Sequence, residues 1–290
     1  MSKKIMPERI KALAIDLDGT TLLPDATLGE YTCICLKKLI LKGKQIIIAT
    51  GRSIEASEKY RSAMGAQGPM VFFNGAVVAD ISSGNVLYSS LINPDVVEFG
   101  VYLAQSLGVH YQVYLPAGIS PETGKKDKKQ KVETLLIDKY SSEAEFYRQH
   151  TGTNAVIKDL KNMAAMPDFE GCIKGMFIAD PSLHDKIRQK MHERFDDQIN
   201  IIRSHPTFLE VLNKGASKGE GLKIAMKHRE LEPEEVIAFG DEENDLSMFA
   251  AAGFSAAPES AREKIRNAAD FIYGSNAKEG LAVFIEKTFL

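Results

Sequence analysis

Two aspartates follow a short apolar run near the start of the chain, in the stretch A-L-A-I-D-L-D-G-T-T-L. Asp16 and Asp18 would stand at the exit of a buried strand, where an ionised carboxylate loses hydration free energy unless a partner compensates it. A metal ion, an arginine or water can be that partner. A second acidic run, G-D-E-E-N-D, follows another apolar segment and begins its acidic part with Asp241.

The carboxyl ends of parallel strands lie along one edge of a sheet, and α/β proteins bind their ligands at that edge. We therefore expect Asp16, Asp18 and Asp241 to converge. Three clustered carboxylates repel one another, and at least one keeps its proton unless a cation neutralises the group. Mg²⁺ is a hard cation with octahedral oxygen coordination, so the pattern predicts a magnesium site.

Two further strand ends add hydrogen-bond donors to the same edge. The run I-I-I-A-T-G-R places the Thr50 hydroxyl and backbone N–H groups, including that of Gly51, at a helix start. The run S-K-G places Lys218 in the first turn of another helix. Helix N-termini attract anions through their free N–H groups and dipole. Phosphate fits this arrangement, because Mg²⁺ and Lys218 would neutralise its charge and leave Asp16 to attack.

Short apolar runs alternate with helical patterns at both ends of the chain, which indicates an α/β fold with a parallel sheet covered on both faces. Capping boxes predict helix starts at Thr27 with Glu30 and at Ser217 with Glu220. Residues 84–212 differ, because the strands predicted over 199–203 and 207–212 have no helix between them, as in an antiparallel α+β module.

The predicted organisation is one core built from residues 1–83 and 213–290, with residues 84–212 inserted as a second domain. The connections near 82–84 and 213–215 contain small or turn-forming residues suited to hinge bending. The charged stretch 121–131 is expected to be a solvated loop, in preference to a phosphate or partner site.

The overall composition narrows the class of partner. The 290 residues carry a net charge of −3, which does not favour binding to nucleic acid or to an anionic membrane. No run of 18 apolar residues predicts a membrane span, and three cysteines are too few for a disulfide framework. We expect a cytoplasmic protein, a monomer or weak homodimer, that acts on a small phosphorylated metabolite.

Four segments resemble the motifs of the haloacid dehalogenase superfamily: D-L-D-G-T-T-L, I-I-I-A-T-G-R-S, S-K-G-E-G-L and G-D-E-E-N-D-L-S-M. F-F-N-G-A, H-P-T-F-L-E-V and G-S-N-A-K-E-G-L-A resemble its Cof-type sugar-phosphatase branch. The resemblance covers both core segments almost end to end and is much weaker between them. It implies a Rossmann-like core, an inserted α/β cap that sets substrate specificity, and Mg²⁺-dependent phosphoryl transfer.

The resemblance also implies a role for each motif residue. Asp16 would be the nucleophile that forms an aspartyl-phosphate, and Asp18 the general acid and then the base for water. Asp245 would fix Lys218 or a water on the metal. The phosphoryl oxygens would be held by Thr50, Gly51, Lys218 and Asn244, and Mg²⁺ by Asp16, the backbone carbonyl of Asp18, and Asp241.

Three other residues are candidates for contacts with the substrate, namely Arg52, Asn74 and Lys174. Thr21 departs from the family pattern, because an apolar residue is usual at that position.

The function predicted first is a phosphatase for a small phosphorylated metabolite, with a sugar phosphate as the leading substrate class. A phosphomutase or phosphotransferase using the same aspartyl-phosphate is the alternative, and the motifs do not separate the two. A receiver of the two-component type also clusters aspartates with threonine and lysine, but the chain length, the D-x-D spacing and the insertion argue against it. A catalytically silent binding protein is a further alternative, but no site residue is missing, and turnover of p-nitrophenyl phosphate would decide between an enzyme and a binder.

Overall fold

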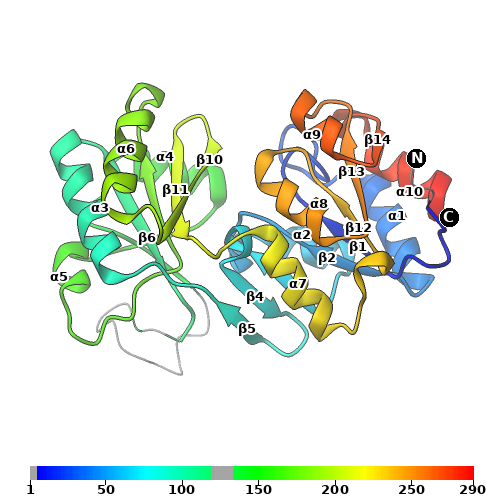
Figure 1. Ribbon diagram of the computed structural model, residues 1–290, viewed down its shortest axis with the longest axis horizontal. Helices are drawn as coiled ribbons and strands as arrows, with labels where there is room; N and C mark the ends of the chain where they lie inside the picture. Colours follow the sequence, from blue (N-terminus) through cyan, green and yellow to red (C-terminus); the bar gives the residue numbers. More distant parts are fainter. Residues whose placement is uncertain (1–4, 119, 121–132) are drawn as a thin grey trace. The chain divides into compact units, whose positions relative to one another are not determined.

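The computed structural model of the chain describes residues 5–118, 120 and 133–290 (Figure 1). The chain divides into two compact units. Unit 1 contains Met1–Arg52, Ser57–Tyr88 and Ser217–Leu290, and unit 2 contains Ser53–Ala56 and Ser89–Ala216. The loop predicted at 121–131 lies outside the described residues. Among the described residues, none of the helices combines the length and the apolar character needed to cross a bilayer.

Unit 1 is built on a five-stranded parallel sheet with the strand order β14-β13-β12-β1-β2. The first strand, β1, pairs with β2, which is close in sequence, and with β12, which is distant: Ala12 lies opposite both Gln45 and Val236. The strands are β1 (Ala12–Ile15), β2 (Gln45–Ile48), β12 (Val236–Phe239), β13 (Phe254–Pro258) and β14 (Phe271–Tyr273).

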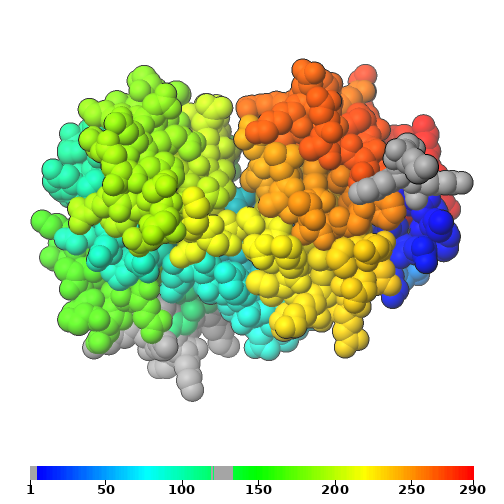
Figure 2. Space-filling model, in the orientation of Figure 1, coloured from blue at the N-terminus to red at the C-terminus, as the bar shows by residue number. Residues whose placement is uncertain are grey.

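Helices cover both faces of this sheet, as the continuous apolar strands require. Helices α7, α8 and α9 pack on one face, and α1 packs with α10, whose Phe284 contacts Phe239 of β12. On the side of unit 1 seen in Figure 2, most of the surface is yellow to red, so it is formed by segments after Ser217. The helices are α1 (Glu30–Leu41), α2 (Ile54–Met64), α7 (Lys218–His228), α8 (Leu246–Ala251), α9 (Glu263–Ala268) and α10 (Gly280–Phe289).

A second, three-stranded sheet follows β2 in the chain. It contains β3 (Pro69–Phe72), β4 (Val77–Asp80) and β5 (Asn85–Ser89), and β3 runs antiparallel to β4. β3 also touches the end of β2 through a parallel bridge between Ala49 and Val71. The apolar run M-V-F-F-N-G at 70–75 is typical of a single strand, but β3 ends at Phe72 and residues Phe73–Gly75 form a tight 3₁₀ turn. Residues 82–84, which the sequence suggested as a hinge, connect β4 to β5.

Unit 2 has a six-stranded sheet in the order β10-β11-β9-β6-β7-β8, and each neighbouring pair except β7–β8 is antiparallel. This is the predicted α+β architecture. Helices α3, α5 and α6 bury one face of the sheet in a single apolar core. The elements are α3 (Pro94–Leu107), β6 (His110–Leu115), β7 (Thr134–Ile137), α4 (Ser142–Thr151), β8 (Ala155–Ile157), α5 (Leu160–Ala164), β9 (Lys174–Ile178), α6 (His184–Phe195), β10 (Ile199–His205) and β11 (Phe208–Asn213).

Candidate active site

The loop that leaves β1 folds tightly around Asp16. The side chain of Asp16 is buried, and the Thr21 hydroxyl donates to its backbone carbonyl at 2.5 Å. Gly19 has φ +80°, and a Cβ atom on it would lie only 2.2 Å from Oδ2 of Asp241. Glycine is therefore required here both by the left-handed backbone and by the close approach of a carboxylate.

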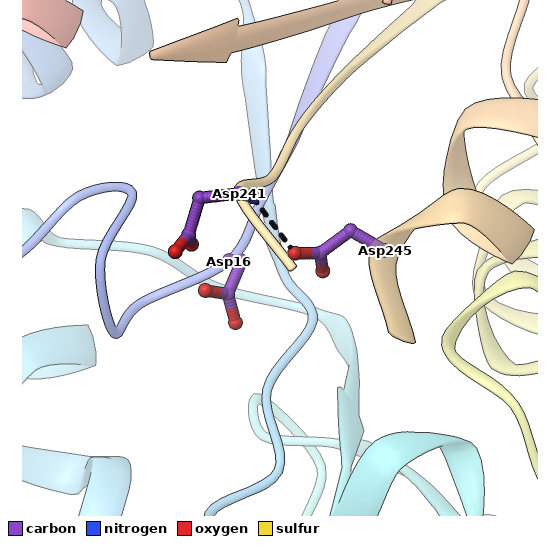
Figure 3. Close-up of side chains that lie close together, drawn as sticks. All are labelled: Asp16, Asp241 and Asp245. Carbon is purple, nitrogen blue, oxygen red and sulfur yellow. Dashed lines mark hydrogen bonds between the residues drawn. The ribbon is translucent and has the colours of Figure 1, made fainter. Parts of the chain in front are cut away.

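Three carboxylates meet at this point. Asp16, Asp241 and Asp245 each offer one oxygen, and these oxygens lie within 4.8 Å of one another (Figure 3). Oδ2 of Asp245 accepts hydrogen bonds from the backbone N–H groups of Asp241 at 2.9 Å and Glu242 at 3.0 Å. The Thr20 hydroxyl donates to Oδ1 of Asp241 at 2.6 Å. The cluster thus joins the ends of β1 and β12, two strands that are adjacent in the sheet.

Lys218 supplies the positive charge of the cluster. Its Nζ lies 2.6 Å from Oδ1 of Asp16 and 2.7 Å from Oδ1 of Asp245, and the side chain is 2% exposed. The residue sits at the start of α7, where the Ser217 hydroxyl caps the helix by accepting from the N–H of Glu220. The predicted N-cap, Ser217, thus places the lysine at the first helical position, directed at the end of β1.

The electrostatic balance of the cluster favours a bound cation. Burial raises the pKa of Asp16 well above its usual value, and Lys218 only partly opposes this. Burial likewise raises the pKa of Asp241 to about 7, against the hydrogen bond from Thr20. Although burial works against a charged amine, the two carboxylates hold the pKa of Lys218 above its usual value. One lysine and three carboxylates, of which Asp16 and Asp245 are buried and Asp241 is half-buried, leave an oxygen-rich site with excess negative charge, and these donors fit a hard divalent cation.

Asp18 is placed differently from the expectation that its side chain joins Asp16 and Asp241. Its carboxylate is 53% exposed and forms a two-point ion pair with Arg52, with Nε to Oδ2 at 2.8 Å and Nη2 to Oδ1 at 2.6 Å. The third carboxylate of the cluster is Asp245 instead. Spacing alone did not distinguish the two, because β1 ends at Ile15 and the alternation of side chains along a strand does not extend through the turn that contains Asp18.

The remaining phosphate-site candidates lie at the end of β2 and at the loop before α8. Thr50 is fully buried, and its hydroxyl accepts from the N–H of Arg52 at 3.2 Å. Gly51 is packed against the side chain of Asn74. Asn244, which is half-buried, donates from Nδ2 to Oδ1 of Asn74 at 2.9 Å.

Lys174 belongs to unit 2, whereas the phosphate-site candidates above belong to unit 1. Its Nζ lies 3.0 Å from Oε1 of Glu210 and 5.3 Å from the centre of the Tyr114 ring. Both charged side chains of this pair are almost completely buried, at 3% and 4% exposed. The ion pair is therefore part of the interior of unit 2.

Sequence reasoning missed three hydroxyls that order the site. Thr20 and Thr21 bond to Asp241 and to the backbone of Asp16, as described above, and Ser247 accepts from the N–H of Gly219 at 3.0 Å. Two threonines directly after D-x-D-G were a usable signal, since hydroxyls in a tight turn hydrogen-bond to nearby groups. Thr21 in particular is the polar residue at a normally apolar position.

Comparison with known proteins identifies the family. Residues 13–285 match the model of the haloacid dehalogenase-like hydrolases. The chain belongs to this family. A Bacillus subtilis relative, named 5-amino-6-(5-phospho-D-ribitylamino)uracil phosphatase YitU, is 27% identical over 96% of this chain and 97% of its own.

Solved structures agree with this haloacid dehalogenase-like fold. The crystal structure of a Thermotoga maritima protein is 26% identical, with a TM-score of 0.79 over 96% of this chain and 97% of its own. A haloacid dehalogenase-like hydrolase from Bacteroides thetaiotaomicron is 22% identical and has a TM-score of 0.83 over 97% of this chain and 100% of its own. The predicted fold class, α/β with a parallel-sheet core, is confirmed, and so is the predicted enzyme class, a hydrolase of the phosphatase type.

Proposed function

We propose that the chain is a Mg²⁺-dependent phosphatase that hydrolyses a small phosphorylated metabolite through an aspartyl-phosphate on Asp16. The observation that carries this proposal is the pairing of a buried Asp16 carboxylate with Lys218 Nζ at 2.6 Å, beside a second carboxylate, Asp241, at the end of the adjacent strand. A carboxylate becomes a useful nucleophile toward phosphorus when neighbouring cations draw charge from the phosphoryl oxygens.

The reaction has two displacements at phosphorus. In the first, an oxygen of Asp16 forms a bond to phosphorus, the bond to the ester oxygen breaks, and Asp18 gives a proton to the leaving oxygen. In the second, Asp18 takes a proton from water, the water oxygen bonds to phosphorus, and the carboxylate of Asp16 leaves as inorganic phosphate is released. Lys218, Thr50, the N–H of Gly51 and Asn244 hold the phosphoryl oxygens in both steps.

The magnesium ion would be held by Asp16, Asp241 and the backbone carbonyl of Asp18. When bound, Mg²⁺ neutralises charge on the phosphoryl group and helps to orient it. Asp245 is not proposed as a direct ligand of the ion, because its oxygens already accept hydrogen bonds from Lys218 and from two backbone N–H groups. In the structure Arg52 donates one hydrogen bond to each oxygen of the Asp18 carboxylate, so at least one of the two has to break before Asp18 carries the proton that it gives to the leaving oxygen.

The proposed substrate is a phosphate ester of a sugar or a similar polyol. The B. subtilis relative carries a phospho-D-ribityl group in the name of its substrate, which supports this class. We further propose that unit 2 acts as the cap that selects among such esters, since the groups proposed for catalysis in unit 1 serve any phosphate monoester. A phosphomutase would use the same intermediate, with a second hydroxyl in place of water.

Hydrolysis of p-nitrophenyl phosphate tests the proposal. The wild type should turn over in the presence of Mg²⁺, and Asp16→Asn should lose several orders of magnitude in kcat while remaining folded by circular dichroism at the assay temperature. Asp25→Asn, a change at an exposed aspartate of unit 1, is the matched control and should retain full activity. Activity of Asp16→Asn above about a tenth of wild type would refute the assignment of the nucleophile.

Labelled water separates hydrolysis from transfer to a second hydroxyl. In ¹⁸O-water a phosphatase releases phosphate that contains one labelled oxygen per turnover. Exclusive formation of a second phosphate ester without label would instead identify a phosphotransferase. A panel of phosphorylated sugars then ranks substrates by kcat/KM.

A further inference from the structure

We propose that the turn Phe73–Gly75 positions the phosphate-binding residues, and that Asn74 acts on the substrate through Asn244 without being a ligand of the substrate itself. This inference rests on the proposed function and adds to it an element outside the four motifs. It also changes the role of Asn74, which the sequence suggested as a direct substrate contact.

The backbone of this turn is unusual. Phe73, Asn74 and Gly75 have φ values of +50°, +54° and +94°, so two residues other than glycine occupy the left-handed region in succession. Such conformations are unfavourable for residues that carry a Cβ atom, and they persist only where the surroundings impose them. Here the N–H of Phe73 donates to the carbonyl of Arg52, and the N–H of Asn74 donates to the carbonyl of Thr50, both at 3.0 Å. The turn is thereby fixed to the segment that follows β2.

The side chain of Asn74 reaches from this segment to the loop before α8. It is completely buried, its Oδ1 accepts from Nδ2 of Asn244 at 2.9 Å, and its Nδ2 would lie 3.0 Å from a Cβ atom on Gly51. The two ends of the Asn244 carboxamide are opposite in hydrogen-bonding character, and only the NH₂ end attracts a phosphoryl oxygen. By accepting from that NH₂ group, Asn74 sets which end is available beside it for the substrate.

The third residue of the turn contacts the helix that carries Lys218. A Cβ atom on Gly75 would lie 1.9 Å from the carbonyl oxygen of Ser217, the N-cap residue of α7. One three-residue turn thus touches the Thr50–Arg52 segment, Asn244 and the start of α7. These three places supply the phosphoryl-oxygen ligands proposed above.

A double-mutant cycle tests whether Asn74 acts through Asn244. Asn74→Gly removes the carboxamide and keeps a residue that tolerates the left-handed backbone. We expect it to raise both KM for p-nitrophenyl phosphate and Ki for inorganic phosphate about 10-fold, the loss of one hydrogen bond to a charged group. Asn244→Ala should have a similar effect, and the double variant should be less than about 2-fold worse than either single variant, because contacts in one network are not additive.

Two further variants keep the test decisive. Glu230→Gly changes another left-handed residue, φ +53°, in an exposed turn, and should leave KM and Ki unchanged. Asn74→Asp retains an oxygen acceptor for Asn244 and a residue type that tolerates this backbone. In this variant Asn244→Ala should still cost about 10-fold, whereas in Asn74→Gly it should cost under about 2-fold. Each cost is the ratio of a variant with Asn244→Ala to the same variant without it, so a general effect of the charge added by Asn74→Asp cancels.

Several outcomes would overturn the inference. Independent, multiplying losses in the double variant would mean that Asn74 does not act through Asn244. Unchanged KM and Ki in a folded Asn74→Gly protein would give the turn no part in phosphate binding, and a fall in kcat alone that follows the folded fraction would make its role purely structural. A wild type that neither hydrolyses p-nitrophenyl phosphate nor binds phosphate with Mg²⁺ would refute the proposed function, and this inference with it.

Discussion

Replacing Lys218 with methionine should destabilise unit 1 by an amount that the geometry of the carboxylate cluster sets. The lysine is 2% exposed and lies 2.6 Å and 2.7 Å from two buried carboxylate oxygens, on Asp16 and Asp245. Methionine fills similar space but leaves both carboxylates without their shared cation. Breaking a buried ion pair from one side costs about 3–5 kcal/mol, a large part of the 5–15 kcal/mol that typically holds a domain folded.

Thermal unfolding without added metal measures this loss. At about 2–4 °C per kcal/mol for domains of this size, the midpoint should fall on the order of 10 °C. Lys223→Met is the matched control, because Lys223 lies on the same helix and pairs with Glu220 at 2.7 Å while 56% exposed. Exposed pairs contribute about 0–1 kcal/mol, so this control should shift the midpoint by only a few degrees at most.

Two additional measurements identify the cause of the destabilisation. The double variant Lys218→Met/Asp16→Asn removes one of the stranded charges and should recover part of the lost stability. Added Mg²⁺ should raise the midpoint of Lys218→Met more than that of the wild type, because ligand that binds only the folded state stabilises it. A metal-free Lys218→Met protein that melts within about 2 °C of wild type would show that the three carboxylates do not need the lysine.

Three other predictions concern unit 2 and the metal. Burial raises the pKa of Glu133 to about 7. Between about pH 4.5 and 7 the folded chain therefore keeps a proton that the unfolded chain releases. The free energy of unfolding should fall by up to about 3 kcal/mol as the pH rises through this window. Glu133→Gln should remove that slope in urea titrations at several pH values, and an unchanged slope would contradict the assignment. Lys174→Met should lower the free energy of unfolding in urea by about 3–5 kcal/mol, because it leaves the buried Glu210 carboxylate without its partner. The double variant Lys174→Met/Glu210→Met should lose clearly less, because the remaining charge is also removed. Equal losses in the single and double variants would show that the pair is not coupled. EDTA should abolish hydrolysis of p-nitrophenyl phosphate, and added Mg²⁺ should restore it. Ca²⁺ should not restore it, because the coordination shell of Ca²⁺ is larger and looser than that of Mg²⁺. Full activity after exhaustive chelation would exclude the metal site.

Local sequence signals were sufficient where the interacting groups are close along the chain. The Ser217 cap of α7 is an example, since Ser217 and Glu220 are one helical turn apart. The capping box predicted at Thr27 was wrong for the opposite reason. Helix α1 begins at Glu30 after Gly29, and the N–H of Thr32 donates to Oε2 of Glu279 at 2.7 Å. A side chain 247 residues away satisfies that helix start, and no local pattern contains it.

The candidate site follows the same rule. Strand ends predicted which segments meet, because parallel strands share an edge, and this brought Asp16 together with Asp241. Which side chains then pair depends on turn geometry, as the ion pair between Asp18 and Arg52 and the entry of Asp245 into the cluster show. The turn at Phe73–Gly75 was hidden in an apolar run, and its asparagine–glycine pair was the one available sign of a left-handed turn.

The position of β1 between β2 and β12 has a consequence for how the protein is made. Its partner Val236 is separated from Tyr88, the last residue of the earlier unit 1 segment, by about 150 residues, which a ribosome adds in roughly 7–30 s at about 5–20 residues per second. Throughout that interval one edge of an apolar strand is without its neighbour, and such edges pair readily with other chains. Early folding of the intervening unit would shorten the distance that the returning segment must span. Nascent chains that stop before β12 should therefore be the aggregation-prone species, and shielding them during translation should matter more for yield than any change to the finished enzyme.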